Sequence, residues 1–225
     1  ATATFKAARN IFQSSGTTIS SSSNKLNVIL WSNSDNDKGG RIRALGSITT
    51  NGGNLVLAGN TDNDSDGIPD GTAKGYSQSG DTTNKIGIEL SNSASTFSTG
   101  GGSMVLRGEA YTDASSYGIY NLASLSTGIG NVTATGTGWY FHLYFGTTGT
   151  VTTTSGNVSL SGTSGTITNS NGIELVGNTT SGTDTITTSS GNISITGTGA
   201  NSGTGVLLSN ARLLSESGAI TLTGS

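Results

Sequence analysis

The sequence predicts an all-β chain that folds as a right-handed parallel β-helix, and three observations support this. The octapeptide SGNISITG at 190–197 recurs in altered form along the chain. Within each copy, apolar and small polar residues alternate, which is typical of a strand with one buried face. The copies follow one another at short intervals, as in solenoid proteins. Right-handedness is expected because crossovers between parallel strands are almost always right-handed.

Each copy of the octapeptide is expected to form one strand between two glycine-containing turns. The related segments are 52–59, 101–108, 129–136, 155–162 and 217–224. In the 190–197 copy, we expect Ile193 and Ile195 to be buried and Ser194 and Thr196 to face water, because successive side chains of a strand point to opposite faces.

The spacing of the copies sets the size of the repeat. The second glycine of the opening pair stands at 53, 102, 130, 156, 191 and 218, which gives intervals of 49, 28, 26, 35 and 27 residues. The short intervals indicate a coil of roughly 27 residues. Two other runs recur within it: a glycine-led apolar run (87–90, 118–122, 172–175, 205–208) and a threonine-rich run (150–155, 185–190). We therefore expect three short strands per coil and about eight coils, in a single domain over 1–225.

Composition excludes several classes of protein. The chain has 36 glycines, one proline and no cysteine, and its net charge is −3. Without cysteine there is no disulfide framework, iron–sulfur cluster or thiolate zinc site. No apolar run approaches the roughly 20 residues of a membrane-spanning helix. Since basic residues form no patch either, neither membrane insertion nor nucleic-acid binding is expected.

An asparagine follows the turn in four copies of the octapeptide. Equivalent asparagines on successive coils stack, and stacked amides form hydrogen-bonded ladders in cross-β structures. We expect a structural ladder that contains Asn54, Asn131, Asn157 and Asn192, with Ser103 and Ala219 at the equivalent places in two other coils.

The segment NKLNVILWSNSDNDKGGRIRALGSITTNGGNLVLAGN (24–60) resembles the β-helical coils of filamentous-haemagglutinin-type adhesins, the large exoproteins exported by two-partner secretion. NVSLSGT and NISITGT resemble the repeats of the same family. The resemblance implies an extracellular or outer-surface rod that serves adhesion or builds filaments. Its partners would be further copies or neighbouring repeats of the same protein, or a cell-surface glycan or protein. Because ATATFKAARN already alternates like a strand and is no signal peptide, the chain is expected to be a segment of a longer protein.

One coil carries an insertion. The interval of 49 residues exceeds 27 by 22, which places a loop insertion at about 61–83. This loop contains DNDSDGIPD at 62–70, which matches the pattern D-x-D-x-D-G-x-x-D and resembles the calcium loops of thrombospondin type-3 repeats.

The chemistry of this motif favours calcium, which takes six to eight oxygen ligands. Gly67 would permit the tight turn, and Ala73 stands where an EF-hand has its last glutamate. Without the four aspartates the chain has 9 acidic and 10 basic residues, so its negative charge is concentrated here. The alternative is a solvated acidic turn. The expected calcium ligands are Asp62, Asp64, Asp66, the carbonyl of Ile68, and Asp70.

The strand GWYFHLYFG at 138–146 is unusually aromatic. With a period of two, Trp139, Phe141, Leu143 and Phe145 share one face, and Tyr140, His142 and Tyr144 share the other. One face is expected to be core and the other an exposed surface for a glycan or protein. The alternative is a widened coil that buries both sets. The candidate surface comprises Tyr140, His142, Tyr144 and Trp139.

These observations favour a structural and adhesive rod that is not an enzyme. The first alternative is a carbohydrate-active β-helix enzyme, similar to polysaccharide lyases or hydrolases. Glu89 and Glu174 occupy the same place in two GIEL runs. They are about three coils apart, roughly 15 Å, beyond the ~6.5–9.5 Å of an inverting carboxylate pair. We therefore expect both to be surface residues.

An ice-binding solenoid is the second alternative. It is suggested by Thr-x-Thr pairs, but these fall on different strands of the coil, whereas ice binding needs one flat face. The pairs are Thr152/Thr154, Thr185/Thr187, Thr196/Thr198 and Thr221/Thr223.

Overall fold

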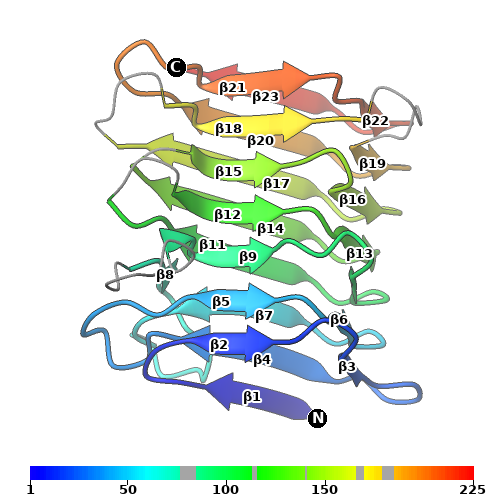
Figure 1. Ribbon diagram of the computed structural model, residues 1–225. Coiled ribbons are helices and arrows are strands. Elements are labelled where there is room, and N and C mark those ends of the chain that lie inside the picture. Colours follow the sequence, from blue (N-terminus) through cyan, green and yellow to red (C-terminus); the bar gives the residue numbers. More distant parts are fainter. Residues whose placement is uncertain (77–84, 113–115, 140, 166–169, 179–184) are drawn as a thin grey trace.

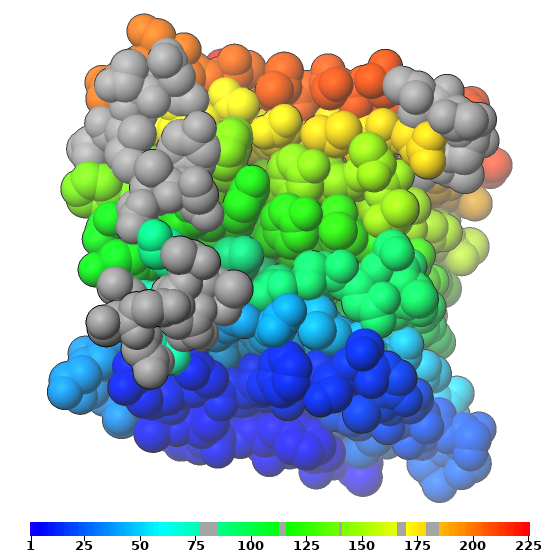
Figure 2. Space-filling model, viewed as in Figure 1, coloured from blue at the N-terminus to red at the C-terminus, as the bar shows by residue number. Residues whose placement is uncertain are grey.

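The computed structural model describes residues 1–76, 85–112, 116–139, 141–165, 170–178 and 185–225. The strands stack into one column with the two termini at opposite ends (Figure 1). Successive parts of the sequence follow one another along the column, so each coil lies beside the coils before and after it (Figure 2). The fold is all-β, as predicted. In the described residues, no helix is long and apolar enough to cross a membrane.

Three parallel sheets form the sides of the column. The first contains β1 (Thr2–Lys6), β4 (Asn27–Ser32), β7 (Leu55–Gly59), β11 (Met104–Glu109), β14 (Val132–Gly138), β17 (Val158–Ser164), β20 (Ile193–Thr198) and β23 (Ile220–Gly224), and β8 (Ala73–Lys74) also pairs with β11. The second contains β2 (Ile11–Gln13), β5 (Ile42–Ala44), β9 (Ile88–Leu90), β12 (Tyr117–Asn121), β15 (Phe141–Phe145), β18 (Ile173–Val176) and β21 (Val206–Ser209). The third contains β3 (Thr18–Ser20), β6 (Ser47–Thr49), β10 (Thr96–Ser98), β13 (Ser124–Gly128), β16 (Thr150–Thr153), β19 (Ile186–Thr188) and β22 (Leu213–Ser215).

The three recurring sequence runs correspond to the three sheets. The octapeptides form the first sheet, the glycine-led runs the second and the threonine-rich runs the third. The chain makes about seven turns of about 28 residues, rather than eight. The eighth strand of the first sheet is not followed by further strands of the other two sheets, and this accounts for the difference.

The coil is right-handed, as predicted. In Figure 1 the strands of the second sheet lie in front and run from left to right. The chain then passes through the third sheet at the right, returns behind through the first sheet and rises by one coil. This is the hand that the twist of parallel strands favours.

The core runs along the inside of the column as stacked rows of apolar side chains. Ile193 and Ile195 are fully buried and pair in register with Val158 and Leu160, whereas Ser194 and Thr196 face outward. The predicted alternation of the octapeptide is therefore confirmed. Burying a side chain of this size contributes about 1.5–3 kcal/mol, and each coil obtains this only from its neighbours.

Two small residues shape the turn before six strands of the first sheet, β7, β11, β14, β17, β20 and β23. A Cβ atom added to the second glycine would overlap backbone of the preceding coil, as Gly156 would overlap the carbonyl of Gly130. The hydroxyl of a threonine three residues earlier donates to the carbonyl of that glycine in four coils, and Thr153 bonds Gly156 in this way at 2.6 Å. The repeated T-x-x-G is a sequence signal for this turn.

The insertion interrupts a strand of the first sheet. β11 pairs with β7 as far as Leu57 and resumes its pairing at Ala73 in β8. The residues between these two points form a loop over the outer face of the first sheet. The predicted insertion at about 61–83 includes residues 77–83, which lie outside the described part of the chain.

Candidate calcium loop and aromatic surface

The loop at 60–72 is fastened to the outer face of the first sheet. Trp31 Nε1 donates to the carbonyl of Asn60 at 2.6 Å, and Arg107 Nη1 donates to the carbonyl of Pro69 at 2.8 Å. Between these two points the side chain of Ile68 packs on a buried apolar cluster of the sheet, formed by Ile29, Trp31, Val56 and Ala58. The loop therefore has a fixed place on strands β4, β7 and β11.

Backbone amides of the loop bond its own carboxylates. Asp62 accepts from the N–H of Gly67 at 2.9 Å and from that of Asp66 at 3.2 Å. Asp70 accepts from the N–H of Asn63 at 2.7 Å. Gly67 has φ +85°, in the left-handed region that glycine adopts without strain. The turn at Gly67 thus folds the acidic segment back on itself.

Three of the four predicted carboxylates converge. Asp62, Asp64 and Asp70 each offer an oxygen within 4.8 Å of the others. Asp66 is not part of this group, and its Oδ1 accepts from the N–H of Ile68 at 2.8 Å. Ile68 lies in the same loop, with its side chain directed to the sheet. The converging set matches the hard oxygen ligands that calcium takes.

The crowding of carboxylates in the loop affects the pKa of Asp64. The backbone N–H of Asp66 bonds Asp64 and lowers its pKa. Desolvation, the charges of Asp66 and Asp70 and a hydrogen bond with Asp62 act in the other direction, so that the pKa of Asp64 is raised. A cation among these carboxylates would reverse this effect, because opposite charge favours ionised carboxylates.

The aromatic strand differs from the two-faced pattern that the sequence predicts. Leu143 and Phe145 are in the core, but Phe141 lies outside and stacks on Tyr117. His142 is fully buried, so it does not share an exposed ridge with Tyr144. Trp139 is 41 % exposed, and Tyr140 lies outside the described residues. The strict period of two is wrong here because the strand begins only at Phe141, next to the corner of the coil.

Four half-buried rings form what we call the aromatic patch: Tyr117, Tyr120, Phe141 and Tyr144. Tyr120 and Tyr144 stack with centroids 5.1 Å apart, and Tyr117 and Phe141 stack at 5.3 Å. The patch lies on the outer side of the second sheet. Sequence reasoning missed Tyr117 and Tyr120, although Tyr120 in GIYNL occupies the same place as Glu89 in GIEL.

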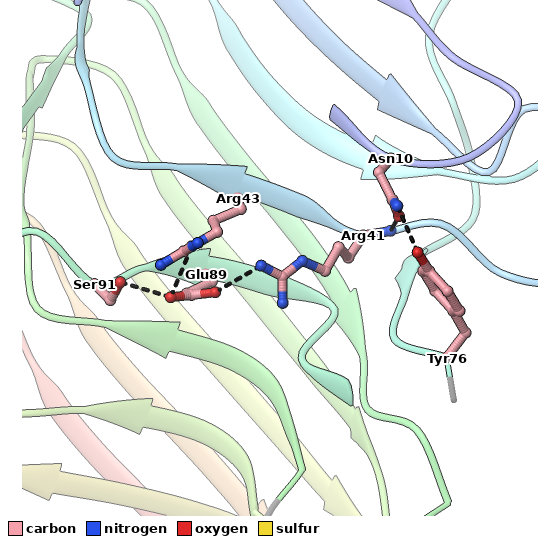
Figure 3. A network of polar contacts seen from close by, with 6 residues as sticks. All are labelled: Asn10, Arg41, Arg43, Tyr76, Glu89 and Ser91. Atoms are coloured by element: carbon pink, nitrogen blue, oxygen red, sulfur yellow. Dashed lines mark hydrogen bonds and ion pairs between the residues drawn. The ribbon is translucent and has the colours of Figure 1, made fainter. Parts of the chain in front are cut away.

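The carboxylates at the two ends of this row have different surroundings. In register, Glu89 lies beside Tyr120, and Glu174 lies beside Tyr144. Glu89 is only 7 % exposed and forms ion pairs with Arg41 at 3.1 Å and Arg43 at 3.2 Å (Figure 3). Burial raises the pKa of Glu174. The expectation that Glu89 is a surface residue is therefore wrong, because two arginines of the preceding coil compensate its buried charge.

Burial of His142 predicts a pH dependence of stability. Desolvation lowers its pKa below the ordinary 6.5, although hydrogen bonds to the carbonyl of Asn171 and to the backbone of Gly138 oppose this. The unfolded chain then binds the proton more tightly, so stability falls as the pH drops below about 6.5, by at most about 1.4 kcal/mol per pH unit.

We expect His142→Gln to flatten the decrease in unfolding free energy between pH 7 and 5.5. Urea denaturation at several pH values measures it. Equal slopes for the two proteins would contradict the assignment.

The asparagines after the turns form a row along the column. The Oδ1 atom of each accepts from the backbone N–H of the equivalent residue one coil further, as Asn131 does from Asn157 at 2.9 Å. The row begins at Asn27, which lies outside the octapeptides and was not predicted, and continues through Asn54, Ser103, Asn131, Asn157 and Asn192 to Ala219. These side chains thus bond the backbone of the next coil.

The Thr-x-Thr pairs are divided between two sides of the column. Thr152 and Thr187 belong to β16 and β19 of the third sheet, whereas the pairs at 196/198 and 221/223 are in or at β20 and β23 of the first. The four pairs therefore do not form a single face.

Comparison of the chain with protein-family models, with curated proteins and with solved structures found no match. The molecule is a parallel β-solenoid repeat protein, a class that its fold defines.

Proposed function

We propose that this chain is an extracellular structural and adhesive rod, a β-solenoid segment of a bacterial surface adhesin or filament, and not an enzyme. The observation that supports it best is the unbroken parallel pairing of the first sheet from β1 to β23. A column of this kind transmits force and keeps its two ends at a fixed distance, because every coil is bonded to the next. The resemblance of residues 24–60 to filamentous-haemagglutinin-type adhesins agrees with this function.

The ends of the column favour association with a further coil. Ile220 and Leu222 of β23 continue the buried rows of Ile193 and Ile195, yet they are 41 % and 46 % exposed. At the other end, Phe5 of β1 is 45 % exposed. Open strand edges with apolar side chains pair readily with other strands. We propose that the next coil is supplied by neighbouring repeats of the same protein or, in the isolated chain, by a second copy.

Sedimentation velocity over a range of concentrations tests this association. We expect the sedimentation coefficient to rise with concentration for the natural sequence and to stay constant for Ile220→Lys. The matched control is Thr221→Lys on the outward side of the same strand, which should still associate. A natural chain that stays monomeric, or equal loss in both variants, would refute end-to-end stacking.

The aromatic patch is the proposed adhesive surface. Aromatic residues are enriched where proteins bind partners, and these rings lie on an outer side of the rod. The enzyme alternative has less support because Glu89 is neutralised by two arginines. Glu89 and Glu174 are also separated by the strands β12 and β15, which makes about three strand spacings, roughly 14 Å.

We also propose that Asp62, Asp64 and Asp70 bind calcium. The loop reaches the first coil, since Thr2 and Thr4 of β1 share a hollow with Asp66 and Gly67. Calcium would therefore stiffen the loop over the N-terminal coils.

Calcium at about one hundred times its dissociation constant is expected to stabilise the fold by about 2.7 kcal/mol and so to raise the melting temperature. Asp64→Asn should abolish the shift, whereas Asp35→Asn in another acidic turn should keep it. Scanning calorimetry with calcium or a chelator measures this. An equal shift in Asp64→Asn would contradict the site.

A further inference from the structure

The loop at 60–72 creates two hollows on the outer face of the first sheet. One has a volume of about 300 Å³ and lies against β1, β4 and β7, and the other, of about 230 Å³, lies against β7 and β11. Asn54, Val56, Asp66 and Ile68 line both, so the hollows adjoin. Together they form a groove, which we call the subloop groove, across four strands of the sheet. Its length is about three strand spacings, roughly 14 Å.

The floor of the subloop groove is amphipathic. One row along it is polar and the next is largely apolar, because side chains in register on parallel strands form rows across the coils. The polar row contains Thr2, Asn27, Asn54 and Ser103. The largely apolar row begins with Thr4 and continues through Ile29, Val56 and Val105. A ligand with an apolar face and polar edges is complementary to such a floor.

The charges at the wall of the groove favour a neutral ligand. Asp66 and Asp70 line it, and Arg107 donates to the carbonyl of Pro69. An anionic ligand would meet the carboxylate of Asp66, which lies outside the proposed calcium ligands. Asp66 stands outside the group of converging carboxylates and borders both hollows, so its carboxylate is placed to accept hydrogen bonds from hydroxyl groups.

We propose that the subloop groove binds a short neutral oligosaccharide. A pyranose ring has C–H faces that fit the half-buried side chains of Val105 and Ile68, and its hydroxyl groups fit the polar row and Asp66. Two or three sugar units match the length of the groove, and its volume lies in the range of small-molecule sites. This inference rests on the proposed adhesive function and assigns that function a second surface, apart from the aromatic patch.

Titration of four disaccharides, namely cellobiose, lactose, maltose and N,N′-diacetylchitobiose, tests the proposal by saturation-transfer NMR in the presence of calcium. We expect saturable binding of at least one of them. Val105→Phe, which fills one hollow, and Asp66→Asn, which changes an exposed loop residue without adding bulk, should each weaken it at least tenfold. The matched control is Thr133→Phe, which places the same side chain in the same outward row one coil further on, beyond both hollows.

Two results would overturn the proposal. One is no saturable binding of any of the four sugars. The other is binding that Val105→Phe and Asp66→Asn leave unchanged, or that Thr133→Phe weakens equally. Circular dichroism of each variant shows whether it is folded, and Asp66→Asn keeps the test valid if Val105→Phe is not. Sedimentation velocity of the same samples tests the proposed rod independently. Stacking without sugar binding would overturn the proposed sugar site and leave the proposed rod intact.

Discussion

Glu89→Ala is expected to destabilise the solenoid by about 3–5 kcal/mol, the loss typical when one partner of a buried ion pair is removed. Arg41 is only 5 % exposed and would keep its charge without the carboxylate that now lies 3.1 Å away. Arg43 and the hydroxyl of Ser91, which bonds Glu89 at 2.7 Å, would lose the same partner. Because these groups join β5 to β9, the damage should lie between two successive coils (Figure 3).

Urea denaturation followed by circular dichroism measures this loss. Glu174→Ala is the matched control, since Glu174 occupies the same outward row three strands further on and has no arginine in register beside it. We expect the control to lose less than about 1 kcal/mol. Simultaneous replacement of Arg41, Arg43 and Glu89 by apolar residues of similar volume should be close to neutral. If Glu89→Ala costs no more than Glu174→Ala, the ion network does not hold the coils together.

Gly156→Ala is the second large effect that we expect, with a loss of about 3 kcal/mol, the upper end of the range typical of overpacking. The new Cβ atom would overlap the backbone carbonyl of Gly130, and backbone cannot move aside as the end of a flexible side chain can. The coils would separate at this point, which weakens the pairing of β14 with β17. The same experiment measures it.

The neighbouring substitution Ser155→Ala provides the control for Gly156→Ala. Ser155 is exposed, and its backbone N–H bond to Gly128 does not depend on the side chain. The unfolding free energy of Ser155→Ala should therefore stay within about 0.5 kcal/mol of that of the natural protein. Equal stability of the two variants would show that glycine is not required at this turn for close stacking of the coils.

Much of the fold could be predicted because its information is local and repeated. The alternation in each octapeptide determines which face is buried, and equal spacing places Ile193 over Val158 without any long-range reasoning. The acidic loop was also found from the sequence, since its carboxylates lie within nine residues of one another. Which of the four aspartates converge could not be predicted, because only the folded loop places Asp66 apart from Asp62, Asp64 and Asp70.

Features that depend on neighbouring coils could not be predicted. Glu89 resembles Glu174 in sequence, yet only Glu89 is paired with two arginines, which stand 48 and 46 residues earlier in the preceding coil. His142 and Phe141 deviate from simple alternation where the chain turns a corner. The subloop groove likewise arises from a loop laid over strands that are far away in the sequence.

Electron microscopy of the purified chain, with calcium and then with a chelator, decides whether the solenoid is a self-stacking rod. We expect rods of uniform width that join end to end in calcium and shorten in chelator, as the loop over the N-terminal coils loosens. Rounded particles, or single short rods that calcium does not affect, would contradict a self-stacking rod braced by a metal.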